Sequence, residues 1–259
     1  MSDLSAVETE LLDGAGYVVL PDLITPARAQ EARSLVLAAL ADASSAGQIS
    51  FGSIVSRRNG HDHLGGLFHK GRIFEELVQL ARLIEIGEAM LGDDMTLSAY
   101  SVRVLNPGAK PMGVHIDYPY WAMRGPHSVR PPLMMQVILM LQDFTEDNGA
   151  TLVVPGSQKA GCAPNPEQFA RAAIKVAGRC GSAILSHGLL WHDTSQNRTN
   201  EPRLALLLNY SRKVIRPMMD DLADVPGEVM ARATPKLRQL LGLEFRLALA
   251  KDVGSMSRR

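Results

Sequence analysis

A histidine and an aspartate stand two positions apart in the segment Gly113-Val114-His115-Ile116-Asp117-Tyr118. The segment has the composition of a β-strand end, where residues two apart point to the same face. His115 and Asp117 can therefore offer an imidazole nitrogen and a carboxylate oxygen to one point in space. Two histidines and one carboxylate form the facial triad that suits non-haem Fe(II) oxygenases. The pair predicts two of three metal ligands, and the third must come from elsewhere in the chain.

Seven histidines supply the candidates for the third ligand, and two of them, His187 and His192, lie close together. Arg203 follows His192 at the start of an apolar stretch that is expected to be a strand. If both face one cavity, the guanidinium can form a bidentate pair with a carboxylate. An oxygenase that uses a keto acid needs a metal for the 2-oxo group and an arginine for the far carboxylate. His187 lacks this arginine spacing, so we favour His192 and expect His187 to be a hydrogen-bonded core or pocket residue.

The overall composition is that of an ordinary globular protein. The chain has 259 residues, of which 46% are hydrophobic, and it carries 27 basic and 27 acidic side chains. Because no basic stripe stands out, nucleic acid is not an expected partner. The two cysteines have no zinc or redox spacing, and the N-terminus has no signal pattern, so we expect a cytoplasmic protein. No apolar run of about 18 residues occurs, so no membrane span is expected.

The first third of the chain is expected to be mostly helical. Apolar side chains recur at helical spacing in residues 3–13, 26–43 and 74–91, and residues 17–20 have the composition of a short strand. Residues 47–70 are rich in glycine, serine and polar groups. We expect them to be irregular, with a lid as one interpretation.

Beyond Gly92 the sequence changes to short β-branched and apolar runs separated by turn residues. The expected strands are 95–105, 133–143, 151–154, 182–186 and 204–210. The expected helices in this part are 166–176, as an insertion between strands, and 234–241 and 243–250 near the end. Several short strands with such turns favour a β-sandwich or barrel, with the double-sheet jelly roll among the options.

Four motifs in order resemble the phytanoyl-CoA dioxygenase family of Fe(II)- and 2-oxoglutarate-dependent oxygenases. They are His115-Ile116-Asp117, the Asn-Gly turn and Pro-Gly-Ser loop within 147–157, His192 with Arg203, and the segment Asn197-Arg198-Thr199-Asn200-Glu201-Pro202-Arg203. Gln158 replaces the histidine that usually follows the second motif. Segments 13–20 and 237–242 also resemble the family, so the resemblance covers nearly the whole chain.

The resemblance implies a fold that is mainly β with flanking helices (α+β), built on a double-stranded β-helix, the cupin-like jelly roll. We expect residues 1–259 to form a single domain. In it, residues 1–92 would be a helical N-terminal flank with the lid loop, 93–215 the jelly-roll core, and 216–259 a C-terminal helical segment.

The resemblance also implies the roles of particular residues. His115, Asp117 and His192 would ligate Fe(II), and Arg203 would bind the C5 carboxylate of 2-oxoglutarate. The residues that match other positions around this co-substrate are Thr194, Gln136, Thr151 and Arg103. The implied reaction uses O2 and 2-oxoglutarate to hydroxylate, or otherwise oxidise, a C–H bond of a small molecule. With Asp117 present, the position that takes chloride in related halogenases is filled.

The substrate itself is only hinted at by the sequence. Tyr118, Tyr120 and Trp121 directly follow the metal motif. They could stack on a substrate or cap the core, and the apolar surroundings suggest a ring-bearing molecule such as a natural-product intermediate. His63, in a polar loop, is a further candidate for a substrate contact.

Three other functions stay open. A cupin-type metal oxygenase or isomerase would use the triad without 2-oxoglutarate and would have no use for Arg203. An acyl-CoA hydroxylase would need cations for the phosphate groups, and no Lys/Arg cluster stands out for them. A jelly-roll binding module would have no need of the triad or of the arginine. The oligomeric state is not predicted.

Overall fold

The computed structural model describes residues 3–46, 55–218 and 224–243. The helices are α1 (Leu4–Leu12), α2 (Pro26–Ala46), α3 (Ile73–Leu77), α4 (Ala81–Leu91), α5 (Pro166–Ala172), α6 (Gly227–Arg232) and α7 (Pro235–Leu240). The strands are β1 (Tyr17–Leu20), β2 (Val55–Arg58), β3 (His61–Leu64), β4 (Thr96–Leu105), β5 (Met134–Met140), β6 (Thr151–Val153), β7 (Ile174–Val176), β8 (Ala183–His187), β9 (His192–Thr194) and β10 (Arg203–Ser211). Among the helices described, none is both long and apolar enough to cross a membrane.

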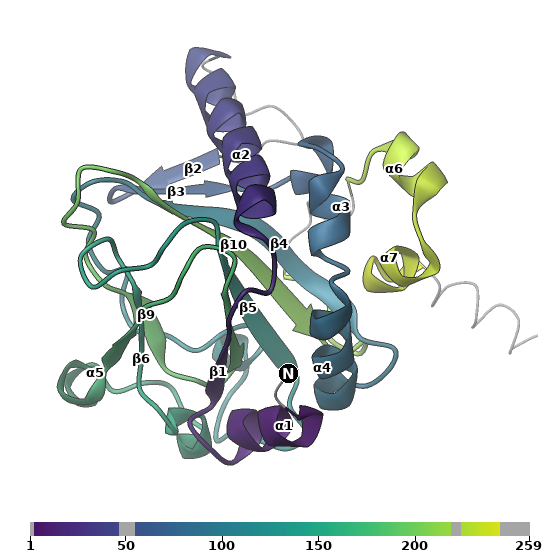
Figure 1. Cartoon of the computed structure of the whole chain (residues 1–259). Coiled ribbons are helices and arrows are strands. Elements are labelled where there is room, and N and C mark those ends of the chain that lie inside the picture. Colours follow the sequence, from purple (N-terminus) through teal and green to yellow (C-terminus); the bar gives the residue numbers. More distant parts are fainter. Residues whose placement is uncertain (1–2, 47–54, 219–223, 244–259) are drawn as a thin grey trace, which may run out of the picture.

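Two antiparallel sheets form the centre of the molecule. The larger one, here the main sheet, has the strand order β1-β8-β5-β10-β4-β3-β2, and the smaller one, the minor sheet, has the order β7-β6-β9. Helices α3 and α4 lie on one side of the main sheet, and β6 and β9 lie on the other (Figure 1). Two packed antiparallel sheets with non-sequential strand order form a jelly roll. The predicted fold class is therefore confirmed.

Alternation along the central strands gives each face of the main sheet its own core. On β5, Met135, Val137 and Leu139 pack with the helices, whereas Ile138 and Met140 pack between the two sheets. Residues two apart on a strand share a face, so β5, which is apolar except for Gln136, contributes to both layers. The inner layer is apolar at one end and, as described below, polar at the other.

The predicted helix 74–91 is two helices, and the main sheet explains the break. The hydroxyls of Tyr100 on β4 and Tyr210 on β10 donate hydrogen bonds of 2.9 Å to the carbonyls of Phe74 and Val78. Carbonyls at a helix end need such partners. The two tyrosines therefore stabilise the end of α3, and α4 begins afresh at Ala81.

The prediction that residues 47–70 are irregular is wrong for the part that the structure describes. Strands β2 and β3 form a hairpin that extends the main sheet beside β4. Its turn is Asn59-Gly60, with φ angles of 54° and 82°. Two left-handed residues in this order suit the tight turn of a hairpin. Residues 47–54 lie outside the described residues, and the lid interpretation stays a prediction.

Two other segments differ from expectation. The helix predicted over 166–176 ends at Ala172, and Ile174–Val176 is strand β7, paired with β6. Helix α6 was not predicted, and the helix expected at 243–250 lies outside the described residues except for its first residue. The proposed subdivision at residues 92 and 215 stays a prediction.

Candidate metal and co-substrate site

His115 and His192 are brought together by a short main-chain pairing. The amide of each donates a hydrogen bond of 3.1 Å to the carbonyl of the other, as an isolated antiparallel bridge. His115 therefore lies beside the first residue of β9 and not at the end of a longer strand, as the sequence suggested. Two residues further on, the amide of Asp117 donates to the carbonyl of Gly188 at 2.8 Å. The segments that carry the three side chains are thus joined by backbone hydrogen bonds.

The side chains of His115, Asp117 and His192 point to one place. Each offers a ligand atom, and these atoms lie within 4.8 Å of one another. Nε2 of His192 is 3.8 Å from Oδ1 of Asp117, and the two imidazole rings are 4.3 Å apart. The i and i+2 argument from the sequence therefore places His115 and Asp117 as expected.

The backbone fixes which nitrogen each imidazole presents. Nδ1 of His115 bonds the carbonyl of Gly113 at 3.0 Å, and Nδ1 of His192 bonds that of Leu190 at 2.9 Å. Because a carbonyl only accepts, both Nδ1 atoms carry the hydrogen. Nε2 of each ring is then left with a free lone pair, which is the arrangement that metal-ligating histidines commonly have.

Asp117 is a buried carboxylate without a cationic side chain beside it in the part of the chain described. Its Oδ1 accepts a hydrogen bond of 3.2 Å from the Gln136 amide, and its Oδ2 has no partner. Burial raises the pKa of Asp117 to about 7, and burial also lowers the pKa of His192. A divalent cation would compensate both effects, because it favours a charged carboxylate and neutral imidazoles. The donor set therefore fits a metal such as Fe(II).

Asp193 is a functional candidate that the sequence analysis missed. Its two carboxylate oxygens accept hydrogen bonds of 3.0 Å from the amides of Met112 and Gly113. This double contact fixes the chain just before His115 to the residue just after His192. The adjacency to His192 was the available signal, but only the fold shows which segment Asp193 holds.

Arg203 lies in the same pocket and is almost completely buried. Its guanidinium lies over the Phe144 ring at 4.3 Å and donates a hydrogen bond of 2.6 Å to the Gly149 carbonyl. Its Nε has no partner, and no carboxylate pairs with it among the residues that the structure describes. Burial, and then the charge of Arg103, lower the pKa of Arg203 to about 9. A buried, uncompensated cation of this kind favours an anionic ligand.

Strand β10 of the main sheet and the turn before it together place Arg203 in the pocket. Asn197 is fully buried, and its side-chain amide donates to the carbonyls of Leu105 and Glu201 at 2.9 and 2.8 Å. This holds the turn before β10. Gly149 has a φ of 92°, and a Cβ there would be 2.6 Å from Leu105. The Asn-Gly turn of the sequence motif thus supplies the Gly149 carbonyl that accepts the hydrogen bond from Arg203, and only glycine fits at this position.

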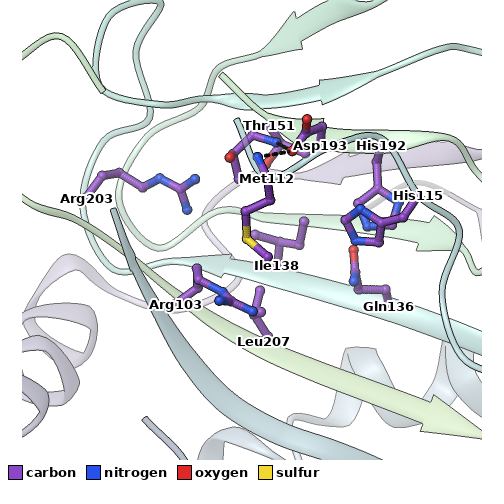
Figure 2. Close-up of a pocket in the computed structure, with 11 residues that line it drawn as sticks. Arg103, Met112, His115, Gln136, Ile138, Thr151, His192, Asp193, Arg203 and Leu207 are labelled. Atoms are coloured by element: carbon purple, nitrogen blue, oxygen red, sulfur yellow. Dashed lines mark hydrogen bonds between the residues drawn. The ribbon is translucent and has the colours of Figure 1, made fainter. Parts of the chain in front are cut away.

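Figure 2 shows how these groups share one pocket, with Arg203 at one end and the imidazoles of His115 and His192 at the other. The cavity has a volume of about 80 Å³. The other predicted co-substrate residues that line it are Arg103, Gln136, Thr151 and Thr194. The buried hydroxyl of Thr194 has no hydrogen-bond partner among the residues that the structure describes. Arg103 lies on β4, where it pairs in register with Ala205 of β10.

The predicted substrate residues lie in different places. Trp121 and Tyr120 line a second cavity that also contacts His115, and Tyr118 is half-buried beside Trp121, with ring centroids 6.0 Å apart. His63 is on β3, in register with Arg103, and lines neither cavity. Burial and the Arg103 charge lower its pKa to about 4. The structure thus separates His63 from the aromatic residues.

Comparison with known proteins identifies the family of this chain. The sequence profile described as "Phytanoyl-CoA dioxygenase (PhyH)" matches residues 12–205. The chain is 26% identical over 230 residues to "Dioxygenase af480" of Aspergillus fumigatus, covering 88% of this chain and 74% of that protein. It is 28% identical to "Dioxygenase cdmA" of Talaromyces verruculosus, covering 90% and 81%.

Solved structures show the same fold at low sequence identity. The epimerase SnoN, in complex with Fe3+, alpha ketoglutarate and nogalamycin RO, matches with a TM-score of 0.63 and 20% identity, covering 86% of this chain and 90% of that one. HygX from Streptomyces hygroscopicus, with nickel and 2-oxoglutarate bound, matches with a TM-score of 0.62 and 16% identity, covering 81% and 88%. The resemblance predicted from the sequence motifs is confirmed by the profile match over most of the chain: the protein belongs to the phytanoyl-CoA dioxygenase family.

Proposed function

We propose that this protein is an Fe(II)- and 2-oxoglutarate-dependent dioxygenase that oxidises a C–H bond of a small organic molecule. The observation that carries the proposal is one pocket with three metal-ligand side chains at one end and the uncompensated guanidinium of Arg203 at the other. A keto acid with a distant carboxylate matches both ends at once. Hydroxylation of a substrate R–H would convert 2-oxoglutarate and O2 to succinate, CO2 and R–OH.

In this proposal His115, Asp117 and His192 hold the iron. When bound, the iron supplies the O2 activation that couples loss of CO2 from the co-substrate to oxidation of the substrate. Nε2 of each histidine is free because Nδ1 is held by a carbonyl. Gln136 orients the Asp117 carboxylate, and the orphaned Oδ2 of Asp117 has no competing partner in the described chain.

The far carboxylate of 2-oxoglutarate would bind Arg203. Thr194 offers a hydroxyl that has no partner within the described ranges, and Thr151 lies next to it as its register partner on β6. Arg103 adds a second positive charge to the same pocket. A charge-assisted hydrogen bond in so buried a site is much stronger than one in water. These residues would thus select a dianionic keto acid.

The alternatives can be distinguished by the same residues. A cupin-type oxygenase or isomerase that does not use 2-oxoglutarate would leave Arg203 buried and unpaired, at a cost in stability with no function in return. The acyl-CoA alternative is considered with the second cavity below.

We also propose a small-molecule substrate, without nucleic acid or membrane as a partner. A cytoplasmic location is supported by two free cysteines, Cys162 and Cys180.

Anaerobic titration tests the proposal directly. Adding Fe(II) and then 2-oxoglutarate to the protein should produce the weak visible charge-transfer band of a chelated keto acid. His115→Ala should abolish the band and succinate release, whereas His69→Ala, at an exposed histidine outside both cavities, should preserve them. Folded protein that gives no band would refute the proposal. Turnover without 2-oxoglutarate would favour the cupin-type alternative.

A further inference from the structure

A second cavity, here called the outer chamber, opens beside the metal-ligand side chains. It has a volume of about 600 Å³. The first cavity, which contains Arg103 and Arg203, is here called the arginine pocket, and among the described residues only His115 lines both cavities. A volume of this size suits a drug-sized ligand. Because both cavities contact His115, a molecule in the outer chamber and an anion in the arginine pocket would meet at the same metal.

The two cavities differ sharply in charge. The arginine pocket contains Arg103 and Arg203, and the residues that line the outer chamber include no Lys, Arg, Asp or Glu among those described. Its apolar lining comprises Val114, Ile116, Trp121, Met123, Pro126 and Pro164. Burying a charged ligand group here would leave that group without a counter-ion, which is costly. The chamber therefore favours an uncharged ligand.

The chamber wall is built from two segments held firmly together. The amide of His127 donates a hydrogen bond of 2.6 Å to the Gly161 carbonyl, and Trp191 Nε1 donates to the Cys162 carbonyl at 3.2 Å. Gly161 has a φ of 60°, and a Cβ there would come within 2.3 Å of the His127 carbonyl oxygen. The loop at 161–164 is thus fixed against the loop at 125–127, and the chamber is pre-formed.

Tyr120 forms a buried part of the chamber wall, with its ring and its hydroxyl both held by neighbouring groups. Its ring is buried and stacks on His187 at a centroid distance of 5.9 Å. Its hydroxyl accepts the Leu133 amide hydrogen at 2.8 Å. Gly188 packs closely against this ring, because a Cβ there would lie 3.0 Å from it.

Trp121 and His127 are lining side chains suited to recognising a ligand. The Trp121 side chain is 61% exposed, although its amide is tied to the Asp117 carbonyl by a hydrogen bond of 3.3 Å. His127 is half-buried, and neither of its ring nitrogens hydrogen-bonds to any residue in the described ranges. An indole offers a stacking face for a ring, and an imidazole offers one hydrogen bond to a hydroxyl or carbonyl.

We propose that the outer chamber binds the substrate, and that this substrate is an uncharged, largely apolar, ring-bearing molecule with a hydroxyl or carbonyl group. Trp121 stacks on its ring system, and His127 bonds its oxygen. This inference rests on the proposed function and specifies its substrate class. An acyl-CoA thioester is disfavoured because its phosphates would find no cation in the chamber lining. The same loop carries a cation, Arg124, which is exposed and does not line the chamber.

The test uses Nile red, an uncharged fused-ring ketone whose emission rises in apolar sites, on full-length protein loaded with Ni(II) and 2-oxoglutarate. We expect saturable binding of the dye. Trp121→Ala and His127→Leu should each weaken binding and raise the dissociation constant by about tenfold. Arg124→Ala is the matched control from the same loop, and it should leave that constant unchanged. Palmitoyl-CoA should not displace the dye.

Other outcomes would overturn the inference. No saturable binding of Nile red, or equal binding by wild type and Trp121→Ala, would show that the chamber does not recognise uncharged rings. Displacement by palmitoyl-CoA that is lost in Arg124→Ala would show an anionic thioester at this site. The Fe(II) and 2-oxoglutarate band, measured on the same variants, separates the two proposals: if the band forms while the dye result fails, only the substrate class is wrong.

Discussion

The amide of Leu189 donates a hydrogen bond of 3.0 Å to Nδ1 of His187. Nδ1 is therefore an acceptor, and Nε2 carries the hydrogen and donates to the Val129 carbonyl at 3.1 Å. The turn held in this way contains two carbonyls that matter to the site. The Gly188 carbonyl accepts from the Asp117 amide, and the Leu190 carbonyl accepts from Nδ1 of His192. His187 thus acts on two proposed metal ligands through the turn that follows it.

Two substitutions of His187 should therefore have different effects on metal binding. Asn can reproduce the Nδ1 acceptor, and Gln can reproduce the Nε2 donor. We expect His187→Gln to weaken Co(II) binding by about tenfold, since outer-shell changes typically cost 10- to 100-fold in metal affinity. His187→Asn should retain most of the affinity and the Co(II) visible spectrum. Both variants should lower the melting temperature, so equal metal affinity in the two would refute the positioning role of Nδ1.

Arg203 should control the affinity for the co-substrate. Arg203→Lys keeps a positive charge but loses the fork that can grip a carboxylate and the stacking on Phe144. We expect the KM for 2-oxoglutarate to rise on the order of a hundredfold in Arg203→Met and less in Arg203→Lys. Succinate release at varied 2-oxoglutarate measures this. Arg198→Gln, at an exposed arginine in the preceding turn, is the control. An unchanged KM in Arg203→Met would exclude the carboxylate clamp.

Asp117 should make both metal affinity and apo-protein stability depend on pH. Its folded pKa, about 7, lies above its ordinary value of 3.8, so its stabilising contribution is present at low pH and is lost as pH rises through 7. The metal must displace the bound proton, so its affinity should fall by about tenfold per pH unit below pH 7 and level off above it. Neutral His192 adds no proton competition near pH 7, because its pKa is lowered.

Calorimetric titration of Co(II) at several pH values, with melting temperatures of the apo protein alongside, would measure this dependence. Added metal should raise the melting temperature more at pH 8 than at pH 5.5. In Asp117→Asn the pH dependence between 6 and 7 should disappear together with tight binding. A metal affinity that is flat from pH 5.5 to pH 8 would contradict the buried-carboxylate explanation.

The sequence predicted the proximity of the candidate side chains where spacing along the chain decides it. His115 and Asp117 share a face because they are two apart, and Arg203 enters the pocket as the first residue of an apolar strand. The jelly roll followed from family motifs and from short apolar strands. These predictions needed only spacing along the chain or a motif.

What the sequence did not reveal depends largely on contacts between distant segments. The break after α3 is set by Tyr100 and Tyr210, which only the sheet brings to the helix. The chamber wall, about which the sequence allowed no prediction, places His127 beside Gly161 although they are far apart in the chain. The hairpin at Asn59-Gly60 is different, because its turn signal was present in the sequence but was outweighed by the polar composition around it.

Asp193 provides the last prediction, since its double contact with Met112 and Gly113 should set the position of His115. Asn at this position keeps one acceptor and places an amide donor against the other N–H, so the segment should shift. We expect Asp193→Asn to weaken Co(II) binding by about tenfold and to alter the Co(II) visible spectrum, with the protein still folded. Asp147→Asn, at an exposed aspartate, is the matched control. If Asp193→Asn bound Co(II) like the wild type, the backbone bridge between His115 and His192 would be sufficient to place the ligand.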